Sequence, residues 1–218
     1  MADAPTGYVK FYAKDEKRLC INTIPGHFVT SHSHVNFFVD VTTLKTKCSD
    51  AREAAKVILS RIRHNVAGVD VIVCLDNTEV LGGFLAYEIE KNDAYLRRYQ
   101  DSIRIYTPEI NSMNQLFFRS NVVPDIQGKN ILLLLATTST GKSVNRAIEC
   151  VQYYGANVSG VVSLFSTVKN VNGVEVFSLF TDEDVIGYKA YNPHECPYCA
   201  KGMKIQAMVN GYGFSSIM

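Results

Sequence analysis

The sequence predicts an α/β fold in which a central, mostly parallel sheet is flanked by helices and preceded by a small N-terminal β-rich flap. Short runs of β-branched and apolar residues alternate along the chain with segments of helical periodicity. Several of these apolar runs are continuous, as in strands that are covered on both faces. No internal repeat, low-complexity stretch or proline-rich linker interrupts the 218 residues, so one domain is expected over 1–218.

The flap is expected within residues 1–45. Apolar and polar residues alternate there in short stretches, for example over 8–11, which is typical of strands joined by turns. A helix is expected next, over 51–64, because apolar residues recur at helical spacing and either Ser49 or Asp50 can cap its first turn.

The sheet itself is predicted from three buried runs and the helices that alternate with them. The expected strands cover 69–75, 129–135 and 158–165, and the expected helices cover 80–91 and 143–154. Gly155 stands where the C-cap of the second helix belongs. Parallel sheets bind ligands at the carboxyl ends of their strands, which places the loops 76–79 and 136–143 at the ligand edge.

The loop 136–143 joins a strand to the N-terminus of a helix. Unpaired backbone N–H groups and the helix dipole make such a turn an anion site, and its hydroxyl groups and lysine add further donors. A phosphate is the expected ligand. The residues expected to bind it are Ser139, Thr140, Gly141, Lys142 and Ser143. The alternative is a hydroxyl-rich N-cap, in which Ser143 or Thr140 caps the helix and nothing is bound.

The same residues also match part of a P-loop. Gly141, Lys142 and Ser143 fit the end of the motif GxxxxGK[ST], and residues 176–182 could imitate its acidic second motif. Ala136 stands where the motif requires its first glycine, so this match is short and incomplete.

A longer resemblance, from about Thr30 to Phe165, is to the type I phosphoribosyltransferases, and within them to the orotate phosphoribosyltransferases. It is carried by the phosphate loop and by the segments 36–40 (NFFVD), 85–88 (LAYE), 118–121 (FRSN) and 155–158 (GANV). The resemblance implies the fold of that family, a homodimer, and the binding of a phosphorylated ribose or nucleotide. In an active member, transfer of a phosphoribosyl group from phosphoribosyl pyrophosphate to a base would also require magnesium.

Three departures from the family pattern argue against catalysis. Leu135 and Ala136 stand where the family has two adjacent acids that bind the ribose hydroxyls, and each charge-assisted hydrogen bond lost there is worth about 1.5–3 kcal/mol. The loop 76–79 carries two negative charges where the family has a glycine-rich pyrophosphate loop. The segment 106–115, which corresponds to the catalytic loop, contains neither lysine nor arginine. The alternative function is therefore a non-catalytic nucleotide sensor or interaction protein on the same fold.

Six polar residues outside the five-residue phosphate loop are predicted to contact a ligand. They are Asp40, Asn77, Thr78, Arg119, Lys129 and Thr138. Asn77, Thr78 and Thr138 belong to the two loops at the ligand edge of the sheet. For the other three, Asp40, Arg119 and Lys129, the hypothesis is a supporting polar role in transfer.

A second candidate site lies within residues 190–218, which are expected to form a C-terminal extension. Cys196 and Cys199 form a CxxC pair with His194 two residues before it, and tetrahedral zinc requires four such ligands. The candidates for completing the site are Cys20, His32, His34 and the same motif of a second subunit. The histidines at positions 27, 32 and 34 suggest a metal or phosphate contact, or are exposed turn residues. Two reduced cysteines in a turn are the alternative to zinc.

Composition argues against two classes of partner. The 22 basic and 21 acidic side chains give a net charge of +1, so the chain is expected to bind neither nucleic acid nor an anionic membrane surface. The first 18 residues contain no apolar signal segment, and the apolar run at 131–136 is too short to span a bilayer, so a cytoplasmic location is expected. The six cysteines lack the spacing of a disulfide framework and are expected to be reduced.

Overall fold

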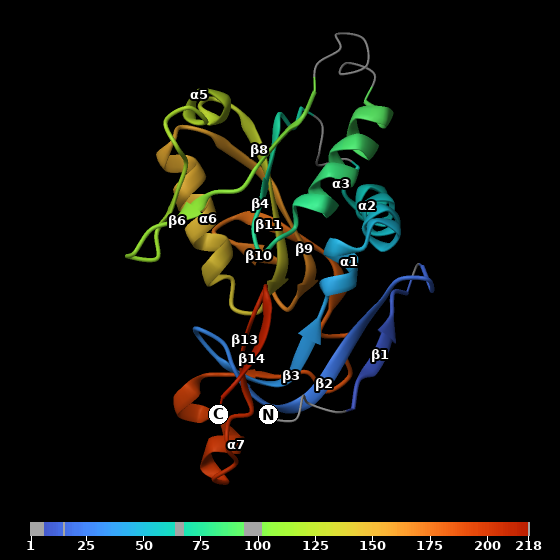
Figure 1. Cartoon of the computed structure of the whole chain (residues 1–218), viewed down its shortest axis with the longest axis vertical. Helices are drawn as coiled ribbons and strands as arrows, with labels where there is room; N and C mark the ends of the chain where they lie inside the picture. Colours follow the sequence, from blue (N-terminus) through green and yellow to red (C-terminus); the bar gives the residue numbers. More distant parts are fainter. Residues whose placement is uncertain (1–6, 15, 64–67, 94–101, 218) are drawn as a thin grey trace.

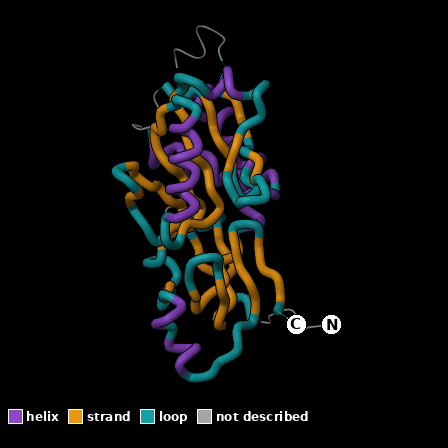
Figure 2. Tube along the Cα trace, turned by 90° about the vertical axis from the view of Figure 1, so that its left-hand side faces the viewer, coloured by secondary structure: helices purple, strands orange, loops and turns teal. Residues whose placement is uncertain are grey.

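The computed structural model describes residues 7–14, 16–63, 68–93 and 102–217, which form two six-stranded sheets one above the other (Figure 1). The upper sheet in this view is mostly parallel and carries the longer helices, and the lower sheet is mostly antiparallel. The side view in Figure 2 shows the same division, with helices gathered around the upper sheet. None of the described helices is long and apolar enough to serve as a membrane span.

The upper sheet has the strand order β10-β11-β9-β8-β4-β5 and is parallel except for the β10–β11 hairpin. Its strands are β4 (Val71–Cys74), β5 (Arg104–Tyr106), β8 (Asn130–Thr138), β9 (Asn157–Ser166), β10 (Asn170–Val171) and β11 (Val174–Thr181). The parallel core predicted from the alternating strands and helices is confirmed. The strand expected over 129–135 runs three residues further, because Thr137 and Thr138 pair with Phe165 and Ser166 of β9.

Helices cover both faces of this sheet. One face carries α1 (Thr42–Thr46), α2 (Cys48–Ile62) and α3 (Glu79–Asn92), and the other carries α5 (Val123–Ile126) and α6 (Lys142–Tyr153). The helix expected over 51–64 begins earlier, because the N–H groups of Asp50 and Ala51 donate to the carbonyl oxygen of Lys47. Lys47 is therefore the N-cap, rather than Ser49 or Asp50. The last residue of the expected helix, at position 64, lies outside the described residues.

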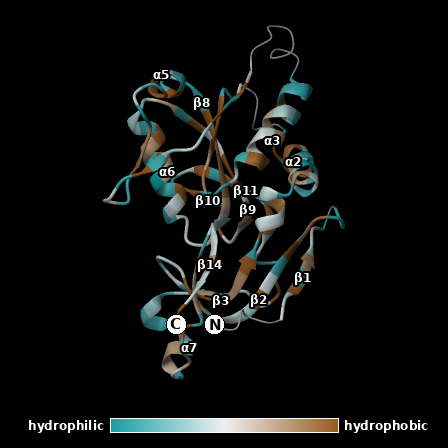
Figure 3. Cartoon of the chain, viewed as in Figure 1, coloured by the Kyte–Doolittle hydropathy of each residue, from teal (hydrophilic) through white to brown (hydrophobic). Residues whose placement is uncertain are grey.

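Alternate residues of β8 belong to two separate hydrophobic clusters. Leu132 and Leu134 pack on the side of α2 and α3, whereas Ile131, Leu133 and Leu135 pack on the side of α6. Successive side chains of a strand point to opposite faces, so a continuous apolar run is what a sheet covered on both faces requires. Figure 3 shows the central strands as hydrophobic along most of their length. Full burial of each such side chain contributes about 1.5–3 kcal/mol to folding.

The lower sheet joins the two ends of the described chain. Its strands are β1 (Val9–Tyr12), β2 (Cys20–Val29), β3 (His34–Asp40), β12 (Ala190–Tyr191), β13 (Ala207–Asn210) and β14 (Gly213–Ser216). The order is β12-β3-β2-β13-β14, with β1 paired to β2. The flap expected within 1–45 is thus only half of a sheet, and the segment 190–218, expected as an extension, supplies three of its strands. The remaining short elements are β6 (Glu109–Ile110), β7 (Leu116–Phe117), η1 (Pro193–Glu195) and α7 (Pro197–Ala200).

Candidate functional site

Of the five residues of the predicted phosphate loop, Ser139 to Gly141 connect β8 to α6, and Lys142 and Ser143 are the first two residues of the helix. Gly141 is the N-cap of α6 with a φ of 76°, and a Cβ at this position would lie 2.8 Å from Cγ2 of Val171. Both the backbone angle and the packing therefore require glycine. Thr167 holds the other end of the loop, since its N–H donates to the carbonyl oxygen of Thr138 at 3.0 Å and its hydroxyl donates to that of Ser139 at 2.6 Å.

The first N–H groups of α6 are available to a ligand. No described side chain caps this helix, so the alternative in which Thr140 or Ser143 caps it is wrong. The helix is 12 residues long and carries the equivalent of about half a positive charge at this end. The P-loop alternative does not match either, because Ala136, the position of its first glycine, lies within β8.

A cavity of about 310 Å³ opens beside the loop. Its walls come from the phosphate loop, the start of α6, the turn between β2 and β3, and the turn between β13 and β14. Lys142, Arg146 and His32 line it and bring positively chargeable groups to its wall. The pKa of His32 is lowered, first by burial and then by the charges of Lys142 and Arg146. Sequence reasoning missed Arg146, although its spacing of four from Lys142 is the signal that places both on one face of a helix.

Asp76, two residues after the end of β4, lines this cavity and contacts Ala136. Its Oδ2 accepts a hydrogen bond from the N–H of Ala136 at 3.3 Å, and a Cβ on Gly211 would lie 2.2 Å from its Cγ. The pKa of Asp76 is raised, because burial outweighs that hydrogen bond and the nearby charges of Lys45 and Arg146. Asp76 and its neighbour both have positive φ angles, 58° and 59°, which store strain of about 1 kcal/mol each.

Lys45, in α1, connects Asp76, which lines the cavity, to the β13–β14 turn. Its Nζ donates to the carbonyl oxygen of Asp76 at 2.5 Å and to that of Gly211 at 2.6 Å, and it lies 5.9 Å from the ring centre of Tyr212. Burial lowers the pKa of Lys45, and the neighbouring carboxylates, Asp76 first, oppose this. Hydrogen bonds from a charged donor are worth about 1.5–3 kcal/mol each, so this lysine fixes the turn in place.

The six further residues predicted to contact a ligand do not come together. Thr138 lines the cavity, whereas Asp40, Asn77, Thr78, Arg119 and Lys129 are not among the described residues that line it. The hydroxyl of Thr78 is buried and donates to the carbonyl oxygen of Leu75 at 2.7 Å. Arg119 is paired with Glu109, with Nε 2.6 Å from Oε1. Lys129 directly precedes β8, at the strand end opposite the loop. Ligand contact by these five stays a prediction.

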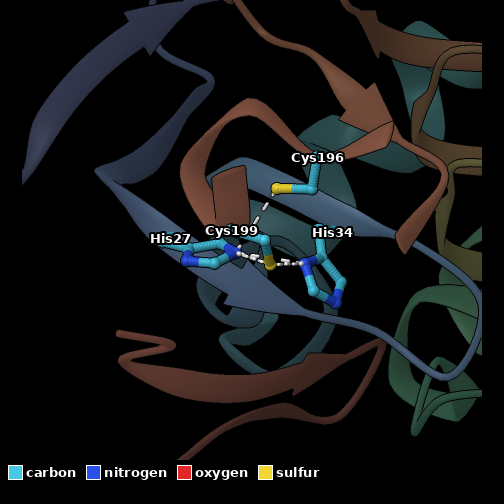
Figure 4. A group of neighbouring side chains, drawn as sticks. All are labelled: His27, His34, Cys196 and Cys199. Atoms are coloured by element: carbon cyan, nitrogen blue, oxygen red, sulfur yellow. Dashed lines mark hydrogen bonds between the residues drawn. The ribbon is translucent and has the colours of Figure 1, made fainter. Parts of the chain in front are cut away.

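A second group of polar side chains lies in the lower sheet (Figure 4). His27, His34, Cys196 and Cys199 point toward one another, and their potential ligand atoms all lie within 4.8 Å of each other. Nε2 of His27 is 3.1 Å from Nδ1 of His34, 3.5 Å from Sγ of Cys196 and 3.7 Å from Sγ of Cys199. Sγ of Cys199 is 3.3 Å from Nδ1 of His34. This His₂Cys₂ cluster could bind a metal ion such as zinc.

Neighbouring groups affect the protonation of the side chains in the His₂Cys₂ cluster. Nδ1 of His27 lies 2.9 Å from the carbonyl oxygen of Met203, so a proton on Nδ1 is donated there and Nε2 keeps its lone pair. Burial lowers the pKa of His34, with a smaller contribution from His27, which favours its neutral, metal-binding form. The pKa of the Cys199 thiol is raised, mainly by desolvation and then by Cys196. A bound ion would displace that proton.

The cluster is more complete than the sequence indicated, and it differs from the predicted set. His194 lies exposed in η1, outside the cluster. His34 was one of the candidates for completing the site, whereas His27, which is only 1% exposed, was suggested as a metal or phosphate contact without being linked to the CxxC pair. The signal for His27 was weak, because it lies 169 residues from Cys196 and no local spacing connects them.

Comparisons with known proteins give structural but no sequence matches. No family model matches the chain, and no curated protein matches it in sequence. UMP synthase of Leishmania donovani superimposes with a TM-score of 0.55 at 16% identity, over 75% of this chain and 34% of the synthase. The chain therefore spans only about a third of that protein's length.

Two further solved structures cover most of both chains. Orotate phosphoribosyltransferase of Aeropyrum pernix superimposes with a TM-score of 0.51 at 14% identity, over 75% of this chain and 90% of the enzyme. Orotate phosphoribosyltransferase of Mycobacterium tuberculosis, in complex with inorganic phosphate, gives a TM-score of 0.50 at 12% identity, over 69% and 80%. Together with the parallel sheet and the strand-loop-helix turn, these similarities show that the chain has the fold of the type I phosphoribosyltransferases.

Proposed function

We propose that the chain binds a phosphorylated ribose or nucleotide in the cavity beside the β8–α6 loop. The observation that carries the proposal is the uncapped N-terminus of α6, which faces a cavity lined by Lys142 and Arg146. A phosphate at this point accepts hydrogen bonds from the free N–H groups and pairs with two cations. The fold supports the proposal, because the Mycobacterium tuberculosis enzyme with a similar structure is in complex with inorganic phosphate.

We further propose that binding occurs without phosphoribosyl transfer, as in a nucleotide sensor. Leu135 and Ala136 are buried within β8 and carry no acceptor for ribose hydroxyls. The two arginines that flank the segment 106–115 are both engaged with acids: Arg119 pairs with Glu109, and Nε of Arg104 lies 3.5 Å from Asp125. Cations that neutralise protein carboxylates are less available to stabilise a departing pyrophosphate. A magnesium requirement would then apply only to transfer and not to binding of the monoester.

Isothermal titration calorimetry with uridine 5′-monophosphate tests the binding site. The double variant Lys142→Ala, Arg146→Ala should weaken binding at least about tenfold, because one charge-assisted hydrogen bond alone is worth about 1.5–3 kcal/mol. Lys56→Ala is the matched control, since Lys56 is a cation of α2 paired with Glu53 on the other face of the sheet. Equal affinities for the double variant and the control would remove the phosphate site from the proposal.

An assay of pyrophosphate release tests the second part. With phosphoribosyl pyrophosphate, magnesium and orotate we expect no release above the protein-free rate. Steady turnover would refute the sensor proposal while leaving the phosphate site intact, because transfer also needs that site.

We also propose that the His₂Cys₂ cluster holds a zinc ion. Zinc–nitrogen bonds of about 2.05 Å and zinc–sulfur bonds of about 2.3 Å give tetrahedral edges of about 3.4 Å between nitrogens and about 3.6 Å between nitrogen and sulfur. The corresponding distances here are 3.1 Å for the nitrogen pair and 3.3–3.7 Å for three of the four nitrogen–sulfur pairs, and all four ligand atoms lie within 4.8 Å of one another. Four protein ligands fill the coordination sphere, which is typical of a structural rather than a catalytic zinc.

Elemental analysis of protein purified without chelator tests this assignment. One zinc per chain is expected for the unaltered protein and for Cys48→Ser, a control at an exposed free cysteine. Cys199→Ser should lose the metal. A zinc content near zero in the unaltered protein would refute the proposal.

A further inference from the structure

The C-terminal strands are attached to the lower sheet by very few backbone pairs. The strand β13 pairs with β2 at Ala207 with Phe28 and at Met208 with Val29, and β12 pairs with β3 over two residues. The strand β14 pairs with β13. A two-stranded hairpin is marginally stable by itself, so other contacts must hold it.

His27 makes several of the contacts that hold the segment before the hairpin. Its N–H donates to Oε1 of Gln206 at 2.9 Å, and its carbonyl oxygen accepts from the N–H of Gln206 at 2.8 Å. Its Nδ1 lies 2.9 Å from the carbonyl oxygen of Met203, and its Nε2 faces Cys196 and Cys199. A metal at Nε2 would therefore lock the segment that leads directly into β13.

The other end of the same hairpin is a wall of the ligand cavity. Residues 208–212 line it, and Lys45 links the turn between β13 and β14 to the parallel sheet, since its Nζ donates to the carbonyl oxygens of Gly211 and Asp76. Asp76 lies against Gly211 on the cavity side. In Figure 1 the hairpin extends from the lower sheet toward the carboxyl edge of the parallel sheet. The hairpin thus spans from the metal cluster to the cavity.

We infer that the metal at the His₂Cys₂ cluster controls ligand binding by holding the β13–β14 hairpin as the cavity wall. This inference rests on the phosphate site and the zinc site proposed above. Removal of the metal releases Cys196 and Cys199 from His27 and His34, the hairpin loses its anchor next to Ala207, and the cavity loses the side formed by 208–212. Ligand affinity then follows the metal content of the protein.

Hydrogen–deuterium exchange measures the release of the hairpin without any ligand. After zinc is removed with a chelator, amides of 207–216 should exchange at least tenfold faster, whereas amides of 131–135, in the parallel sheet, should keep their protection. Added zinc should restore the slow exchange in the unaltered protein but not in Cys199→Ser. Unchanged exchange of 207–216 after verified zinc loss would overturn the inference, and the zinc site itself would stand.

Titration of uridine 5′-monophosphate measures the consequence for binding. The chelated protein and Cys199→Ser should bind at least tenfold more weakly than the zinc-loaded protein, and Cys48→Ser should bind as the unaltered protein does. Lys45→Met should also weaken binding while keeping one zinc per chain, because it removes the hydrogen bonds to Gly211 and Asp76 at the cavity and leaves the four residues of the His₂Cys₂ cluster unchanged. Equal affinity with and without zinc would overturn the inference. If the zinc-loaded protein binds no nucleotide, the phosphate site fails, and the exchange experiment alone decides whether zinc holds the hairpin.

Discussion

Replacement of Gly141 by alanine separates the two reasons for glycine in the phosphate loop. The first is the φ of 76°, which costs a residue with a side chain about 1–2 kcal/mol. The second is the contact with Val171, where a Cβ would lie 2.8 Å from Cγ2, and overpacking of this kind costs about 1–3 kcal/mol. Gly141→Ala should therefore lower the free energy of unfolding by about 2–5 kcal/mol.

Gly128→Ala is the matched control for the first reason alone. Gly128 has a φ of 72°, and nothing lies within 4 Å of a Cβ placed on it, so only the backbone cost of about 1–2 kcal/mol is expected. Val171→Ala removes the contact, and the double variant with Gly141→Ala should be less destabilised than the sum of the single variants by about 0.5–3 kcal/mol. Urea unfolding of the four variants measures all these terms.

The same variants test the link from loop geometry to ligand binding. The alanine at position 141 shifts the N-terminus of α6, so binding of uridine 5′-monophosphate should weaken in Gly141→Ala and stay unchanged in Gly128→Ala. Equal destabilisation by the two substitutions, together with additivity in the double variant, would refute the packing argument for Gly141.

Three further outcomes follow from buried groups around the cavity. Thr78→Val should lose about 1–3 kcal/mol of stability in urea unfolding, since the carbonyl oxygen of Leu75 loses its side-chain donor and that of Leu134 loses one of its two donors. Nucleotide affinity should stay unchanged; weaker binding would instead support the ligand contact predicted for Thr78. The raised pKa of Asp76 means that the folded state holds this proton more tightly than the unfolded state does. The stability that the proton provides is present below the unfolded pKa and is lost as pH rises through the folded pKa. Asp76→Asn should accordingly be more stable than the unaltered protein at pH 7 in urea unfolding. The difference in stability should shrink when the pH falls below 3.8, the ordinary pKa of an aspartate side chain. A difference that does not change with pH would contradict this. Gly211→Ala should displace the Asp76 carboxylate, because its Cβ would lie 2.2 Å from Cγ, and a calorimetric titration should show at least tenfold weaker nucleotide binding; unchanged affinity would separate Gly211 from the cavity wall.

The sequence was sufficient for the parallel sheet because the relevant signals are local. The run 131–136 is apolar without alternation, and the structure buries successive residues of it on opposite faces. The loop after it was recognised from hydroxyl residues, glycine and lysine next to a helix start. The extension of β8 to Thr138 was missed, because pairing with Phe165 and Ser166 of β9 is decided by the neighbouring strand and not by the threonines themselves.

The lower sheet and the His₂Cys₂ cluster could not be predicted in full, because they depend on contacts between distant segments. The strand β13 has four residues and alternates in burial, a pattern too short to reveal its partner. The CxxC pair indicated half a metal site, whereas the choice of His27 and His34 over His194 depends on how β2 and β3 are placed beside α7. Asp76 was read only as a repelling charge, since its hydrogen bond to Ala136 joins positions 60 residues apart.

Because the two ends of the chain share one sheet, the two sheets fold in a fixed order while the chain is being synthesised. The strands of the parallel sheet are complete once residue 181 has been made, and they can pair while translation continues. His27 and Gln206, which bond to each other, are separated by 179 residues, so β2 must wait for its neighbour β13. Contacts of such long sequence separation are slow to form. A nascent chain therefore passes through a stage in which the β8–α6 loop is present but the cavity lacks the wall formed by 208–212, and the nucleotide binding that we propose would be acquired as a late event.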